Sequence, residues 1–151
     1  AVLLFIIAGS SLYSWVLARY QVTHSFIDFL TINVKSPIVL LLLINIFLLL
    51  IGCFIDSVPA LFLLTPILVP LVMTYGIDPV HFGVVIILNL MIGLISPPVG
   101  TVLYTLQKVT GVQMDKLLKH VLPFYVPLFA VLLLITYVPW LVTFIPNIFL
   151  K

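Results

Sequence analysis

The sequence predicts an all-α polytopic membrane protein, and three observations lead to that fold class. Of the 151 residues, 64% are hydrophobic and 7% are charged, whereas soluble domains are about 45–50% apolar and about 25% charged. The charged residues separate long uncharged stretches, and most of these reach the roughly 20 residues that a membrane-spanning helix needs. The single cysteine excludes an internal disulfide and a cysteine-rich metal site. A soluble enzyme, a disordered linker and a nucleic-acid binder are thereby excluded.

Residues 1–36 are expected to hold a transmembrane helix over 1–20 and an interfacial helix over 21–36. The first run ends on aromatic residues and Arg19, which are typical of a membrane–water interface. The second mixes apolar side chains with Asp28 and other polar residues, as an interfacial helix does. The chain begins inside an apolar run, so we expect no signal peptide here and expect a piece of a longer polypeptide.

Residues 37–75 contain two apolar segments joined by an irregular turn over residues 52–59. Two interpretations remain open at this point. The segments are either two full spans joined by an exposed turn, or a re-entrant helical hairpin whose tip stops inside the membrane. Irregular backbone at that depth requires cover by protein or a wet cavity. In the first case Asp56 caps the helix that begins near Ser57, and in the second it braces the tip beside a bound cation.

Residues 79–110 form an apolar run that is interrupted near its middle by Pro97 and Pro98. Neither proline can donate a backbone hydrogen bond, and each disfavours helix in the residue before it. Gly93 and Gly100 flank the interruption and let the chain leave and re-enter helix. We therefore expect two half-helices with unwound backbone between them, which is a broken transmembrane helix.

The turn and the break supply groups that bind a monovalent cation. Carbonyl oxygens freed from helical bonds, the negative ends of half-helices and a hydroxyl hold cations at discontinuous helices. Ser96 offers the hydroxyl. Calcium and magnesium prefer carboxylates, and this sequence has few of them. Sodium is therefore the expected ion, with no further metal and no catalytic residue.

Residues 111–151 are expected to form a cytoplasmic loop and a last transmembrane helix. The polar stretch over 111–120 is a loop or a short amphipathic helix, and Pro123, Pro127 and Pro139 bend or end the span that follows.

Polar residues within the apolar helices have two interpretations each. Asn45 and Asn89 either hydrogen-bond across helices or line a substrate path, and the first is favoured. His81 follows a helix start without a second histidine or cysteine placed for zinc, so capping or packing is favoured over metal ligation.

The sequence also resembles the large membrane subunit of TRAP (tripartite ATP-independent periplasmic) transporters, within the ion transporter superfamily. Four motifs in order carry this resemblance, and it extends from residue 1 to about residue 145. They are Gly52-x-Phe54-x-Asp56, Thr65-Pro66-Ile67-Leu68-x-Pro70, Gly76-Ile77-Asp78-Pro79-Val80-His81-Phe82-Gly83 and Asn89-Leu90-x-Ile92-Gly93-x-x-Ser96-Pro97-Pro98-Val99-Gly100. The family often has threonine where this chain has Ser96, and both carry a hydroxyl. The resemblance would place the chain in the C-terminal half of the subunit.

The resemblance implies an elevator-type fold of two inverted repeats, each with a re-entrant hairpin and a broken helix. Here the hairpin would be residues 37–75 and the broken helix residues 79–110. It implies sodium symport of an organic acid such as a C4-dicarboxylate or a sialic acid. A periplasmic substrate-binding protein would deliver the acid, and a small membrane subunit would brace the scaffold. A sodium-coupled transporter without a binding protein, and a structural or channel-forming subunit, remain alternatives.

The resemblance also assigns site residues. It places one sodium ion on backbone oxygens of Gly52, Gly93 and Val99 and on the Ser96 hydroxyl. Two groups of residues at the hairpin tip and the break are then candidates for coupling or substrate contact, namely Asp56, Ser57, Pro97 and Pro98.

The distribution of basic residues gives an expected orientation. Lys108, Lys116 and Lys119 outnumber Arg19 and Lys35, so the positive-inside rule places the loop near residue 111 in the cytoplasm. The hairpin would then enter from the periplasmic side of a bacterial inner membrane, as part of a multi-pass protein in the lipid bilayer.

Overall fold

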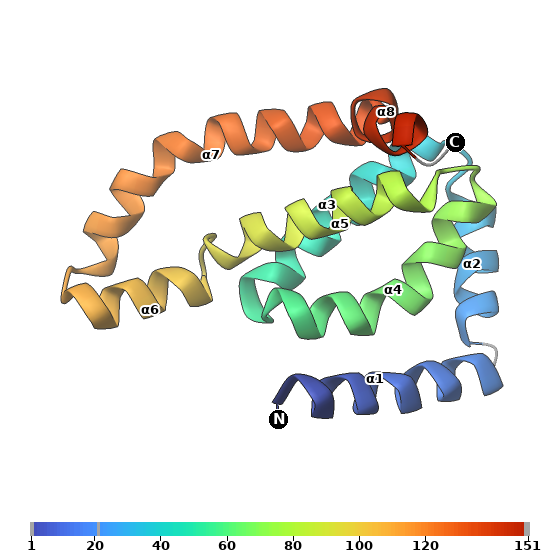
Figure 1. Ribbon diagram of the computed structural model, residues 1–151, viewed down its shortest axis with the longest axis horizontal. Coiled ribbons are helices and arrows are strands. Elements are labelled where there is room, and N and C mark those ends of the chain that lie inside the picture. The colour runs from blue at the N-terminus through green and yellow to red at the C-terminus, as the bar shows by residue number, and fades with distance from the viewer. Residues whose placement is uncertain (1, 21, 150–151) are drawn as a thin grey trace.

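A computed structural model of the chain describes residues 2–20 and 22–149. Within these residues every regular element is a helix, which confirms the all-α prediction (Figure 1). The helices in chain order are α1 (Val2–Arg19), α2 (Val22–Asn33), α3 (Pro37–Phe54), α4 (Ser57–Thr74), α5 (Pro79–Leu94), α6 (Thr101–Thr110), α7 (Met114–Tyr137) and α8 (Pro139–Phe149).

Three of the described helices, α3, α4 and α7, are long and apolar enough to cross a membrane. The shorter helix α5 is also apolar. Many large apolar side chains on these helices are exposed, including Leu42, Leu50 and Leu133. A soluble protein rarely leaves so much apolar surface in water, so the surface is that of a membrane protein whose helices face lipid.

The helices around the centre of the molecule begin where the sequence supplies start signals. Pro37 and Pro79 each occupy the first turn of a helix, where a missing N–H removes no bond. The carboxylate of Asp78 accepts hydrogen bonds from the backbone N–H groups of Val80 and His81 and caps α5. Helix α6 ends at Thr110 and is capped by Gly111, whose φ of 70° is left-handed and suits glycine.

Helices α3 and α4 form an antiparallel pair whose turn lies beside the break between α5 and α6 (Figure 1). Helix α5 packs against both members of the pair. Helix α6 continues beyond the break in roughly the direction of α5, and α7 returns alongside both helices (Figure 1). Helices α1 and α2 pack against α4. The α3–α4 pair, the broken helix formed by α5 and α6, and α7 therefore meet at the break.

The core lies between α3, α4 and α5. Its most buried apolar side chains are Leu48 of α3, Leu71 and Val72 of α4, and Phe82 of α5, all with no exposed surface. Burial of such side chains holds the hairpin against the first half-helix.

The C-terminal segment is more helical than its polarity suggests. Helix α7 begins at Met114, so the connection after α6 is short and the polar residues from Asp115 onward form the first turns of a long helix. Pro123 and Pro127 lie inside α7, which bends along its N-terminal half, and Pro139 starts α8 (Figure 1). A helix can carry polar residues wherever it extends beyond the hydrocarbon core.

Candidate functional site

The turn between α3 and α4 consists of Ile55 and Asp56. The N–H of Ile55 donates to the Ile51 carbonyl and closes the last turn of α3. The Asp56 side chain is exposed, and its Oδ1 accepts a hydrogen bond of 2.8 Å from the backbone N–H of Ser57. Asp56 is therefore the N-cap of α4, and the rest of its carboxylate is available to a partner.

The break between α5 and α6 extends from Ile95 to Gly100, as Pro97 and Pro98 predict. A continuous helix would use the N–H groups of residues 97 and 98, but prolines have none. The Gly93 carbonyl instead accepts a bond of 2.9 Å from the Ser96 N–H. Gly100 has a φ of 51°, which glycine tolerates, and precedes the first residue of α6.

Two glycines bring the last turn of α3 and the last turn of α5, next to the tip and the break, into backbone contact. A Cβ built on Gly93 would lie 2.6 Å from the Cα of Gly52, and one built on Gly52 would lie 3.1 Å from the Cα of Gly93. No other residue type allows so close an approach without movement of a helix. The N–H of Gly100 also donates to the Cys53 carbonyl at 3.3 Å, which ties the far side of the break to the end of α3.

The predicted sodium ligands are distributed around this junction. Gly52 and Gly93 are in contact, and Ser96 and Val99 lie in the break that is tied to α3 through Gly100. The Ser96 hydroxyl donates to the Ile92 carbonyl at 2.8 Å, so its hydrogen is engaged and its oxygen retains acceptor lone pairs. The binding of an ion by these oxygens stays a prediction.

Two cavities lie along α4, α5 and α6, and one of them adjoins the tip. One of about 470 Å³ lies between Asp56 and one face of α6, where Thr101 and Thr105 contribute hydroxyls. A larger one of about 820 Å³ lies between α1, α4 and α5, and its lining is mainly apolar and does not include the tip or the break. Only the first of these two cavities includes Asp56 of the turn, so it is the one that adjoins the predicted site.

Hard oxygen atoms dominate this junction. Among the described residues, no three His, Cys, Asp or Glu side chains lie close enough together to hold a metal ion. A cation here would rest on carbonyls and a hydroxyl, which is the ligand set expected for sodium rather than for a transition metal.

One residue that sequence reasoning missed reaches the break from α7. The Tyr125 hydroxyl donates to the Ile95 carbonyl at 2.5 Å. Tyr125 is a single phenol in an otherwise apolar stretch, and that polarity was the available signal. Sequence alone does not show which distant segment such a side chain meets.

A second polar cluster connects α7 to α5 and to α3. Asn89 donates from Nδ2 to Oδ1 of Asn45 at 2.7 Å, and Asn45 donates from Nδ2 to the Thr136 hydroxyl at 3.0 Å. All three side chains are buried. The favoured interpretation of the two asparagines as interhelical hydrogen-bond partners is therefore confirmed.

His81 makes a similar connection. Its side chain is buried, and Nε2 lies 2.8 Å from the carbonyl oxygen of Ile135. That carbonyl has no helical donor four residues later, because Pro139 stands there. His81 thus packs against α7, as the favoured interpretation predicts.

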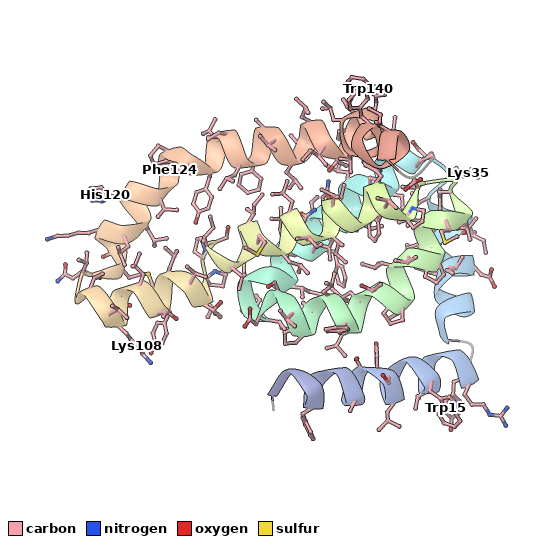
Figure 2. All side chains as sticks on the ribbon, viewed as in Figure 1. Trp15, Lys35, Lys108, His120, Phe124 and Trp140 are labelled. Carbon is pink, nitrogen blue, oxygen red and sulfur yellow. The ribbon has the colours of Figure 1, made fainter. Side chains whose placement is uncertain are left out.

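Charged and aromatic residues mark the two ends of the molecule. Lys35 lies at one end of the long axis, and Lys108 and His120 lie at the other (Figure 2). Helix α5 contributes 16 residues and α6 contributes 10, which correspond to about 24 Å and about 15 Å of helix. The break and the adjoining tip are thus well inside the molecule from both ends.

Comparison with known proteins identifies the family. Residues 1–141 match the family described as "Tripartite ATP-independent periplasmic transporter, DctM component". The sialic acid TRAP transporter large permease protein SiaM of Vibrio cholerae serotype O1 is 46% identical over 151 residues, which cover 99% of this chain and 35% of the relative. The C4-dicarboxylate TRAP transporter large permease protein DctM of Pseudomonas aeruginosa is 37% identical over 145 residues, which cover 96% of this chain and 34% of the relative.

A third relative is a larger polypeptide. The isethionate TRAP transporter permease protein DctMQ of Oleidesulfovibrio alaskensis is 46% identical over 104 residues, which cover 69% of this chain and 16% of the relative. The chain spans about a third of the length of SiaM and of DctM. With a family match across most of its length, the chain belongs to the DctM-component family of TRAP transporters, whose named relatives are permease proteins of the membrane.

Proposed function

We propose that the chain is the C-terminal part of the large permease subunit of a sodium-coupled TRAP transporter. The complete protein imports an organic acid, such as a C4-dicarboxylate or a sialic acid, across a bacterial inner membrane. A periplasmic binding protein delivers the acid, and a small membrane subunit, separate or fused, completes the permease. The observation that carries the proposal is the backbone contact between Gly52 and Gly93, where two interrupted helices meet.

The depth of this contact supports a re-entrant hairpin over residues 37–75. Helices α5 and α6 together provide about 39 Å of helix, more than the roughly 30 Å of a hydrocarbon core. If α5, the break and α6 cross the membrane, the hairpin tip at the break stops within it. Irregular backbone inside a membrane must be buried in protein or line a wet cavity. The backbone of the tip meets this requirement, because it packs against α5 and lies beside the cavity at Asp56.

The chemistry of the junction supports sodium as the coupling ion. Carbonyls of Gly52, Gly93 and Val99 and the hydroxyl of Ser96 are neutral hard oxygens that match a monovalent cation. Asp56 and Ser57 at the tip, with Pro97 and Pro98 in the break, are then placed to couple ion binding to the substrate. The named relatives are TRAP transporter permease proteins, which supports a transporter rather than an enzyme.

The proposed mechanism is alternating access by an elevator motion. The hairpin and α5 share one hydrophobic core, which includes Leu48 of α3 and Phe82 of α5. They therefore move together. Ion and substrate bind at the tip and the break, and the whole unit carries them past a fixed scaffold to the cytoplasmic side. The free energy of sodium binding stabilises the unit when it carries both ion and substrate. This stabilisation couples uptake to the sodium gradient.

The test is uptake of a labelled organic acid by proteoliposomes that contain the complete permease. Uptake that requires both an inward sodium gradient and the binding protein is the expected result. Uptake with sodium but without the binding protein would favour a secondary transporter of another type. Absence of sodium-dependent uptake under either condition would overturn the proposed coupling.

A further inference from the structure

The carbonyl of Ile95 loses its helical donor at the break. In a continuous helix it would accept from the N–H of Val99, but the chain is not helical there. The Tyr125 hydroxyl takes this place with a hydrogen bond of 2.5 Å. A carbonyl exposed at a break in a membrane helix is costly unless it is satisfied, so this bond decides which way the Ile95 carbonyl points.

The phenol is itself held in place by its surroundings. Its ring packs against that of Phe129 one turn later, with ring centroids 6.1 Å apart. Ser96 is a further neighbour of the Tyr125 side chain. The hydroxyl therefore connects α7 to the break.

The bond also controls the next residue. A peptide group is planar, so fixing the Ile95 carbonyl fixes the N–H and the Cα of Ser96. The Ser96 side chain starts from that Cα, and its hydroxyl hydrogen is directed at the Ile92 carbonyl. The remaining lone pairs of Ser96 then have one defined direction relative to Gly93, whose carbonyl the Ser96 N–H engages.

We propose that Tyr125 is a positioning residue for the ion site. By holding the Ile95–Ser96 peptide, it presents the Ser96 hydroxyl to the cation in a preorganised arrangement. The role proposed for Tyr125 acts through the Ile95 carbonyl, to which its hydroxyl donates, and does not involve a bond to the ion. This inference rests on the proposed sodium site at the tip and the break.

The test compares Tyr125→Phe with Tyr75→Phe in the complete permease reconstituted with its partners. Both variants keep the ring and lose one hydroxyl that donates to a backbone carbonyl at 2.5 Å, but Tyr75 bonds Val34 at the other end of the hairpin. The half-saturating sodium concentration of uptake should rise about five- to tenfold in Tyr125→Phe, the effect of one lost hydrogen bond. It should change less than about twofold in Tyr75→Phe, which makes no contact with the site.

Two further measurements separate positioning from a general loss of structure. Substrate affinity at saturating sodium should be unchanged in Tyr125→Phe, and so should thermal stability in choline chloride. In the double variant with Ser96→Ala, the shift in half-saturating sodium should be smaller than the product of the two single shifts, because both residues act through one ligand.

Four outcomes overturn the inference. An unchanged sodium curve in Tyr125→Phe does so, as do equal shifts in the two tyrosine variants. Instability of Tyr125→Phe without sodium would make the role structural. If the unmodified permease transports without sodium, the sodium proposal itself fails, and that result is distinguishable because it needs no variant.

Discussion

Ser96 has one hydroxyl, and its hydrogen bond to Ile92 leaves the oxygen lone pairs for a cation. Ser96→Ala removes this oxygen and leaves both prolines of the break in place. We expect the half-saturating sodium concentration of uptake to rise about tenfold, since a hydrogen-bond-like contact to a charge is worth about 1.5 kcal/mol or more. Ser96→Thr keeps a hydroxyl, so its half-saturating sodium concentration should stay near that of the unmodified protein. Equal sodium curves for all three proteins would remove Ser96 from the site.

Asp56 carries the negative charge of the hairpin tip. In Asp56→Asn the amide oxygen still accepts from the Ser57 N–H, because asparagine is as good an N-cap as aspartate. The variant should therefore insert into the membrane normally. Uptake should fall about tenfold or more, as expected when a contact to a charged group is lost. Normal uptake, measured at equal membrane content, would limit Asp56 to its capping role.

Asn45 is buried between two partners, Asn89 and Thr136. Asn45→Ala leaves a buried amide and a buried hydroxyl with one fewer partner, so we expect a loss of about 1–2 kcal/mol of unfolding free energy. Asn33→Ala is the matched control, because Asn33 is exposed and bonds the Phe29 carbonyl within its own helix. Chemical unfolding of the two variants in detergent measures the difference. Equal stability would show that the buried cluster adds nothing.

At the scale of elements, Gly93 sets the distance between α5 and α3. Gly93→Ala places a Cβ 2.6 Å from backbone atoms of Gly52, so α3 must move away. We expect a loss of about 1–3 kcal/mol, typical of overpacking, together with impaired uptake. Gly83→Ala on the same helix meets no atom within 4 Å and should stabilise the protein by about 0.5–1 kcal/mol. Thermal unfolding measures the stability of the two variants. Equal stability of Gly93→Ala and Gly83→Ala would contradict the backbone contact.

The sequence predicts local elements well and long-range contacts poorly. The break at Pro97 and Pro98 follows from proline chemistry, which acts on adjacent residues, and the structure has it at residues 95–100. The bond from Tyr125 to Ile95 joins segments 30 residues apart, and no periodicity encodes it. The start of α7 at Met114 lies inside the expected polar loop, because charged residues also form helix outside the membrane.

At the scale of the whole molecule, hydropathy alone leaves the nature of the hairpin open. Helices α3 and α4 are 18 residues each, which suits a full span and a re-entrant hairpin equally well. The arrangement in space favours the second, since the tip lies at the break while α6 continues beyond it (Figure 1). The family resemblance had the same implication. The predicted ion ligands follow from freed carbonyls, but their geometry around an ion depends on contacts that sequence does not specify.

The depth of the hairpin tip tests this account most directly. Single cysteines are placed at Val58 beside the tip, at Gln113 between α6 and α7, and at Gly76 after α4, in a cysteine-free permease. A maleimide on a long polyethylene glycol chain, too large to enter a cavity, is then added to either side of the membrane. We expect tagging at residue 113 from one side, at residue 76 from the other, and at residue 58 from neither. Tagging at residue 58 from the same side as residue 113 would mean two ordinary spans and would contradict the re-entrant hairpin.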